Sequence, residues 1–168
     1  MLNPPKLNLE AVHQIGIVVK DIDVSVERYW KEFGIGPWQI FTFGPGAKKL
    51  TYHGEPSAFA LKIAMAQVGP LLIELLQPLS GSTPHQDFLD QKGEGLQHLG
   101  VFVPSLEQAA AVMHTLGYKE ISGAYGFGRE GDGAAAYFDT ENNLGTLLEL
   151  IEMPQEMPPA EKVFPENK

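Results

Sequence analysis

The sequence predicts an α+β fold in which two βαβββ modules are paired. Two observations favour this fold: the chain repeats itself internally, and both halves show the same order of expected elements. Residues 14–33 align without a gap with residues 98–117, an offset of 98 − 14 = 84. A second match places residues 72–76 over residues 147–151, an offset of 147 − 72 = 75. Self-similarity in the same order at both ends of each half indicates a duplicated structural unit.

The first module is expected over residues 11–78. A short run rich in β-branched residues at 15–19 is typical of a strand. Asp21 can cap the helix that follows over residues 21–33, whose apolar residues recur at helical spacing, and Gly34 can end it. Further strands are expected over residues 38–43, 59–67 and 71–76.

The second module, expected over residues 97–153, repeats this order. A strand is expected over residues 99–103, and Ser105 can cap a helix over residues 105–116 that Gly117 ends. Further strands are expected over residues 120–122, 134–138 and 146–151.

The segment between the modules, residues 79–96, is expected to be a linker with one short helix. Thr83 can cap this helix, and Phe88 and Leu89 are expected on its buried face. His85 on this helix is expected to be exposed, as is a histidine of the second module's helix, His114.

Two segments have a composition typical of irregular structure. Residues 123–133 contain five glycines, which favours either a hairpin connection or a mobile lid over a site. Residues 154–168 form a proline-rich tail that is expected to wrap the surface or to fray.

The composition excludes several classes of protein. Twelve Lys and Arg against 21 Asp and Glu give a net charge of −9, which disfavours binding to nucleic acids or anionic membranes. The absence of cysteine excludes disulfides, thiolate metal ligands and a cysteine nucleophile. No apolar stretch approaches the roughly 18 residues of a membrane span, and the N-terminus does not resemble a secretory signal. We therefore expect one cytoplasmic domain over residues 1–168. A homodimer and a small-molecule partner are expected as well, although composition does not indicate either.

Polar residues inside apolar strands are the most informative anomaly. Glu74 and Glu149 each interrupt a run of leucine and isoleucine, and a buried unpaired carboxylate costs several kcal/mol. The repeat makes these two glutamates equivalent, and its other offset makes Gln14 equivalent to His98. If the modules pair about a pseudo-twofold axis, the four side chains converge. One imidazole, two carboxylates and one amide suit a single divalent metal ion such as Zn, Ni, Co, Fe or Mn.

Between residues 12 and 152 the chain resembles the vicinal oxygen chelate superfamily of glyoxalases, epimerases and extradiol dioxygenases. Residues 77–84 and 88–95 are most similar to the methylmalonyl-CoA epimerases. The resemblance implies that the two modules form a curved mixed sheet around a central cavity with one divalent metal. It also implies chemistry through a metal-stabilised enolate. The segments that carry it are residues 16–21, 73–78, 95–98 and 147–150.

Two positions depart from the epimerase pattern. The first metal ligand of the epimerases is a histidine whose register falls on Gln14 here, and glutamine at this position resembles glyoxalase I. His13 remains the alternative ligand, although strand alternation directs it to the opposite face. The base of the epimerases is a glutamate just before the third strand, and Glu55 lies about three residues from that register.

The resemblance implies a metal-dependent isomerase or epimerase acting on a small carbonyl or acyl-CoA substrate. A carboxylate near the reacting carbon would take the proton; Glu149 is the first candidate and Glu55 the second. Tyr52, Tyr125 and Arg129 are candidate substrate contacts. One alternative is a glyoxalase I-type lactoylglutathione lyase, and another is a non-catalytic small-molecule-binding protein of the resistance type. A CoA phosphate would have to bind lysines such as Lys48, Lys49 or Lys62.

Overall fold

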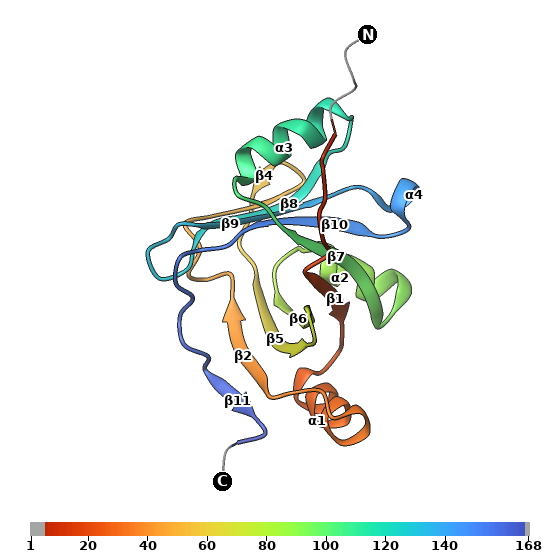
Figure 1. Cartoon of the computed structure of the whole chain (residues 1–168), viewed down its shortest axis with the longest axis vertical. Coiled ribbons are helices and arrows are strands. Elements are labelled where there is room, and N and C mark those ends of the chain that lie inside the picture. Colours follow the sequence, from red (N-terminus) through yellow and green to blue (C-terminus); the bar gives the residue numbers. More distant parts are fainter. Residues whose placement is uncertain (1–5, 167–168) are drawn as a thin grey trace.

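The computed structural model describes residues 6–166, and these form one open eleven-stranded sheet with four helices (Figure 1). The strand order is β11-β2-β5-β6-β1-β7-β10-β9-β8-β3-β4, so the two outermost strands do not pair with each other. The sheet is mixed and curved, and the duplicated halves meet at its centre, where β1 and β7 run antiparallel. This arrangement confirms the predicted fold class.

The two halves have the same strand pairing. In each, the first strand pairs in parallel with the last, and the others follow antiparallel, in the order β1-β6-β5-β2 and β7-β10-β9-β8. The strands of the first half are β1 (Gln14–Val18), β2 (Trp38–Phe43), β5 (Ala60–Val68) and β6 (Leu71–Ser80). Those of the second half are β7 (Gly95–Phe102), β8 (Glu120–Phe127), β9 (Gly133–Phe138) and β10 (Leu147–Glu152).

The helices α1 (Ile22–Phe33) and α3 (Leu106–Thr115) are equivalent elements and lie at opposite ends of the molecule in Figure 1. Asp21 and Ser105 accept hydrogen bonds from the amides three residues later, as predicted for N-caps. Each helix buries its apolar side against its own half of the sheet, so each half has a separate core beneath its helix. A third core lies between the halves and contains aromatic residues of both.

Two further helices are short. α2 (Pro84–Lys92) begins after Thr83, whose side chain caps it, and α4 (Glu141–Leu144) has a single turn. Phe88 and Leu89 are half-buried, as part of the face of α2 that turns inward, and Pro84 and His85 are its buried residues. The expectation that His85 is exposed was wrong.

Three strands lie outside the predicted set. β3 (Lys49–Tyr52) and β4 (Glu55–Pro56) leave the first half, and β3 pairs with β8 of the second half. β11 (Lys162–Phe164) belongs to the tail and pairs with β2 of the first half. These strands have only two to four residues, and β3 and β11 pair with strands that are distant in the sequence, so local pattern does not reveal them.

The glycine-rich segment is mostly strand. Residues 123–127 belong to β8, so only residues 128–132 connect β8 to β9 as a hairpin. In the described part of the chain, no helix has the length and apolar character needed to cross a membrane.

Candidate metal centre

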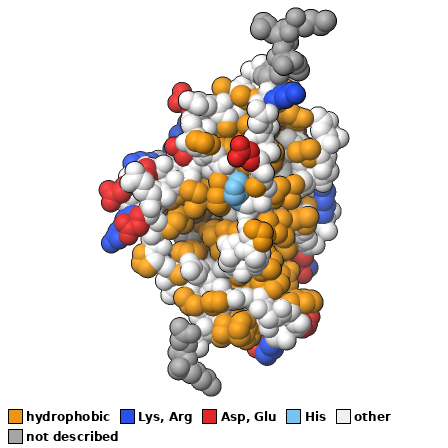
Figure 2. Space-filling view, viewed as in Figure 1, with side chains coloured by type: hydrophobic (Ala, Val, Ile, Leu, Met, Phe, Trp, Pro, Cys, Tyr) orange, Lys and Arg blue, Asp and Glu red, His pale blue; other side chains and the backbone are white. Residues whose placement is uncertain are grey.

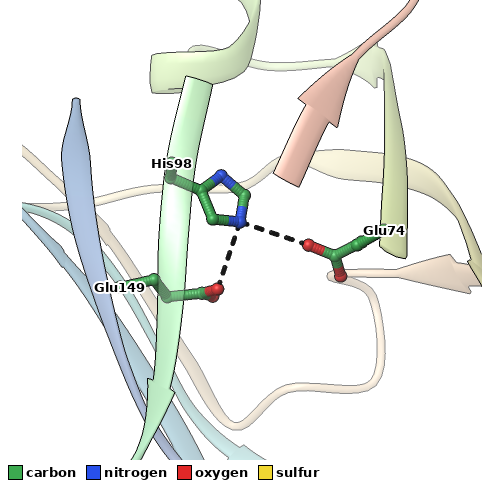
Figure 3. Close-up of side chains that lie close together, drawn as sticks. All are labelled: Glu74, His98 and Glu149. Carbon is green, nitrogen blue, oxygen red and sulfur yellow. Dashed lines mark ion pairs between the residues drawn. The ribbon is translucent and has the colours of Figure 1, made fainter. Parts of the chain in front are cut away.

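Three buried side chains from three strands of the sheet, β6, β7 and β10, meet at one point (Figure 3). Nε2 of His98 lies 3.4 Å from Oε2 of Glu74 and 3.3 Å from Oε2 of Glu149. His98 is 0% exposed, and the two glutamates are 5% and 6% exposed. One nitrogen and two carboxylate oxygens therefore face one another with little access to bulk water.

The strand register explains why these residues converge. Glu74 is adjacent to Gly16 on the parallel pair β6–β1, and Glu149 is adjacent to Gly100 on the parallel pair β10–β7. Across the central antiparallel pair, Gly16 lies opposite His98, and Gln14 lies opposite Gly100. The repeat thus places two carboxylates, an imidazole and an amide around the pseudo-twofold axis.

Gln14 completes the cluster. Its Nε2 donates hydrogen bonds to Oε2 of Glu74 at 2.9 Å and to Oε2 of Glu149 at 3.0 Å. The amide oxygen and nitrogen of glutamine exchange places when the group turns by 180°, so the same side chain can present its oxygen to this point. Gln14 can therefore bridge the carboxylates without a cation and act as an oxygen ligand with one.

Gln97 fixes the orientation of the histidine. Its Nε2 donates to the carbonyl of Pro84 at 2.8 Å, so its Oε1 is left as an acceptor. This Oε1 lies 2.7 Å from Nδ1 of His85 and 3.1 Å from Nδ1 of His98, so both rings donate from Nδ1. The ring of His98 consequently directs Nε2 at the carboxylates, in the manner of a histidine that binds a metal through Nε2.

The electrostatics of the cluster favour a positive charge at Nε2 of His98. Burial alone would lower the pKa of His98, but the nearby carboxylates of Glu149 and Glu74 outweigh it and raise this pKa to about 9. Burial is also the main cause that raises the pKa of Glu74, and His98 opposes it. A proton and a metal ion would compete for this nitrogen.

The residues fit a divalent ion. Nε2 of His98 is buried and makes no hydrogen bond of acceptable geometry within the described residues, although two carboxylate oxygens face it. The set of one imidazole, two carboxylates and one amide, without sulfur, suits a borderline to hard divalent cation. Glu74, His98, Glu149 and Gln14 could thus hold such an ion.

The cluster lies at the wall of a cavity of about 170 Å³. Gln14, Glu74 and Glu149 line it together with His85 and Tyr137. Burial and the charges of Glu149 and Glu74 raise the pKa of Tyr137 well above its usual value, so its hydroxyl stays protonated. Most other lining residues are apolar: Phe41, Phe43, Phe59, Leu61, Ile63, Met65, Leu72, Leu76, Ala124, Phe127, Ala135, Ile151, Met153, Met157 and Pro158.

The structure does not bring His13 to the cluster. Its Nδ1 accepts a hydrogen bond from the amide of Phe102 at 3.1 Å, and its ring stacks on that of Phe102. This placement follows from strand alternation, which directs adjacent residues to opposite faces.

The other predicted site residues also lie outside the cavity lining. Glu55 is exposed on β4, and Arg129 is paired with Glu156. The Tyr52 hydroxyl bonds to Asp87, and that of Tyr125 donates to Glu120 at 2.8 Å. Tyr52 and Tyr125 lie on the internal strands β3 and β8, whereas Glu55 lies on the edge strand β4 and Arg129 in the β8–β9 connection. Their local sequence gave no information on the direction of their side chains.

Three site residues were missed: His85, Gln97 and Tyr137. His85 was expected to be exposed, since its hydrogen bond with Gln97 forms only through tertiary packing and leaves no local sequence signal. Gln97 precedes His98 directly, and a second polar side chain in a buried strand was a usable signal. Tyr137 lies opposite Glu149 on β9 and follows a run of glycine and alanine, in which it is the first large polar side chain.

The sequence matches the model of the glyoxalase/bleomycin resistance protein/dioxygenase superfamily over residues 13–138. The chain belongs to this superfamily. Among curated proteins, the uncharacterized protein YqjC of Bacillus subtilis (strain 168) is 28% identical over 94 residues, which are 55% of this chain and 65% of YqjC.

Solved structures of the superfamily share the fold. Methylmalonyl-CoA epimerase of Mycobacterium tuberculosis is 23% identical, with a TM-score of 0.64 over 92% of this chain and 93% of that one. A variant of the Streptomyces coelicolor epimerase, in complex with 2-nitronate-propionyl-CoA, is 20% identical, with a TM-score of 0.67 over 90% of this chain and 100% of that one. At these identities the likeness establishes the common architecture.

Proposed function

We propose that the protein is a metal-dependent isomerase or epimerase that transfers a proton at a carbon next to a carbonyl group. The observation that carries this proposal is the buried Glu74–His98–Glu149 cluster at the wall of an apolar cavity. Membership of the superfamily and the fold shared with epimerases support it.

The ligands of the ion would be Gln14, Glu74, His98 and Glu149. When bound, a divalent ion supplies positive charge that stabilises negative charge on the oxygens of a substrate. Gln97 positions His98 by accepting from its Nδ1, and the apolar walls exclude water, which strengthens each electrostatic interaction.

Glu149 is the proposed base. Its carboxylate lies at the cavity surface, where it can take a proton from the substrate carbon and return it. Tyr137 is its cross-strand neighbour on β9, and a protonated hydroxyl there can orient the carboxylate. Glu55 lies away from the lining, so the base is assigned to Glu149 alone.

The test is metal-dependent exchange of carbon-bound hydrogen. The metal-loaded protein is incubated in heavy water with methylmalonyl-CoA and with 2-hydroxy ketones, and deuterium incorporation is followed by NMR. We expect Glu149→Gln to reduce exchange by at least 10²-fold, the usual contribution of a general base. Glu55→Gln is the matched control and should retain full exchange. Equal rates in both variants would refute the assignment.

A second candidate is a glyoxalase I-type lyase, which Gln14 favours as first ligand. Its substrate would be the hemithioacetal of methylglyoxal and glutathione, and conversion to the thioester measures this activity. If every substrate is bound and recovered without exchange or conversion, the protein is a binding protein of the resistance type.

A further inference from the structure

Apart from the metal cluster and a few other polar side chains, the cavity is lined by apolar residues. Phe41, Phe59 and Phe127 approach it from β2, the segment before β5, and β8, and they belong to the core between the two halves. A dry cavity of about 150 Å³ accommodates a benzene ring. The volume here, about 170 Å³, therefore suits one ring-sized apolar group.

No lysine or arginine lines the cavity in the part of the chain that the structure describes. The lysines predicted to hold a CoA phosphate have other partners. Lys48 donates to the carbonyl of Gly131 at 3.1 Å, and Lys49 lies 5.2 Å from the ring centroid of Tyr125. Lys62 pairs with Asp23 at 2.5 Å. An anionic substituent inside the cavity would therefore find no cation.

The charge of the cluster leads to the same conclusion. Two ionised carboxylates, Glu74 and Glu149, balance the two positive charges of a divalent ion, and neutral His98 and Gln14 add none. The loaded centre is then uncharged, and an anion entering it would lose hydration without gaining a counter-charge. Neutral substrates avoid this cost.

The tail restricts the cavity further. After β10 the chain contributes Met153, Met157 and Pro158 to the lining before β11 pairs with β2. The backbone carbonyl of Glu156 holds this segment by accepting a hydrogen bond from the backbone amide of Arg129 at 2.9 Å.

In the view of Figure 2, hydrophobic side chains occupy the middle of the face, and charged side chains lie mainly toward its margins.

From these observations we infer that the substrate is an uncharged carbonyl compound with a ring-sized apolar substituent, and not a CoA ester. The inference rests on the proposed function, which supplies the carbonyl chemistry. A 2-hydroxy ketone with a ring is one compound of this class. In it, the C–H bond next to the carbonyl breaks, and its electron pair moves toward the carbonyl oxygen. Glu149 takes the proton, and in heavy water the same carboxylate returns a deuteron, which forms a C–D bond in place of the broken C–H bond.

The test measures binding and exchange separately, on the full chain loaded with Co²⁺. Calorimetry compares 2-hydroxyacetophenone, hydroxyacetone and the 4-carboxy derivative of 2-hydroxyacetophenone. Replacing the ring by a methyl group should weaken binding at least tenfold, because the buried apolar area is lost. The 4-carboxylate should weaken it at least tenfold as well. Tighter binding of the carboxylate or of methylmalonyl-CoA than of 2-hydroxyacetophenone would overturn the inference.

Two exposed residues provide a matched pair of variants. Met153 is 46% exposed and lines the cavity, whereas Leu144 is 55% exposed and does not. Met153→Arg should raise the affinity for the 4-carboxy derivative relative to 2-hydroxyacetophenone, and Leu144→Arg should leave that ratio unchanged. An unchanged ratio in both variants would count against a cavity that selects by charge.

The two proposals can fail independently. Binding of 2-hydroxyacetophenone without deuterium exchange would support the inferred ligand class and refute the isomerase. Exchange into methylmalonyl-CoA without binding of 2-hydroxyacetophenone would support the isomerase and refute the ligand class.

Discussion

The imidazole of His98 lies against the α-carbon of Gly16. A methyl group added at residue 16 would lie 1.8 Å from Cε1 and 2.1 Å from Nε2 of that ring. The space that the histidine occupies at the centre of the sheet therefore exists because its cross-strand neighbour has no side chain.

The first prediction concerns this glycine. Gly16→Ala should displace the His98 ring and lower metal affinity at least tenfold, because the methyl group takes its place. Gly46→Ala is the control, since nothing lies within 4 Å of an added methyl group there. Metal content after dialysis, measured by atomic emission, checks the result. Full metal occupancy in folded Gly16→Ala would contradict it.

The second prediction concerns the identity of the ligands. His98→Ala should abolish stoichiometric binding of the metal, and Gln14→Ala should weaken it, because each removes one donor. His13→Ala should bind metal normally, since its ring stacks on Phe102 and faces away. Loss of metal in His13→Ala with retention in Gln14→Ala would assign the first position to His13.

The third prediction concerns Gln97, which accepts from Nδ1 of His85 and His98. Gln97→Leu removes this acceptor and should reduce metal affinity by about 10–100-fold, as is typical for residues that orient a ligand. Gln97→Glu keeps an acceptor and should retain tighter binding than Gln97→Leu. Competition with a chromogenic chelator measures both, and equal affinity of the two variants would exclude the positioning role.

The fourth prediction concerns the pH dependence of the metal-free protein. The pKa of His98 is about 9 in the fold, against an ordinary 6.5, so its protonated form stabilises the fold. This contribution is complete below about pH 6.5 and is lost as the pH rises toward 9. Urea denaturation with chelator present should therefore show falling stability over this interval.

A matched pair of histidine variants tests whether His98 causes this pH dependence of stability. His98→Asn should flatten the pH dependence, whereas exposed His114→Asn should leave it unchanged. Added metal should restore the stability of the unmutated protein at pH 9, because the ion replaces the lost proton. A flat profile without metal in the unmutated protein would disprove the charge assignment.

The fold could be predicted because the chain is duplicated. The repeat and the caps Asp21 and Ser105 located α1 and α3, and apolar runs located eight of the eleven strands in residues 6–166. β3, β4 and β11 were not predicted, because all three are short. β3 and β11 pair with strands more than 50 residues away, and β4 pairs with β3.

The candidate site could be predicted in part for the same reason. Gln14, Glu74, His98 and Glu149 stood out as polar residues at equivalent positions of buried strands, and the structure brings them together. Tyr52, Tyr125 and Arg129 were selected by residue type alone, and Glu55 was selected by its nearness to the register of the epimerases' base. Their side chains are directed by hydrogen bonds and edge pairing that a linear pattern does not contain.

The strands β3 and β11 cross between the halves in opposite directions. β3 leaves the first half to extend the edge at β8, and β11 returns from the tail to extend the edge at β2. Each edge of the paired halves is therefore bordered by a strand from a distant part of the chain. Cutting the chain between the halves would separate β3 from β8 and β11 from β2, so both edges would lose the strand that now covers them.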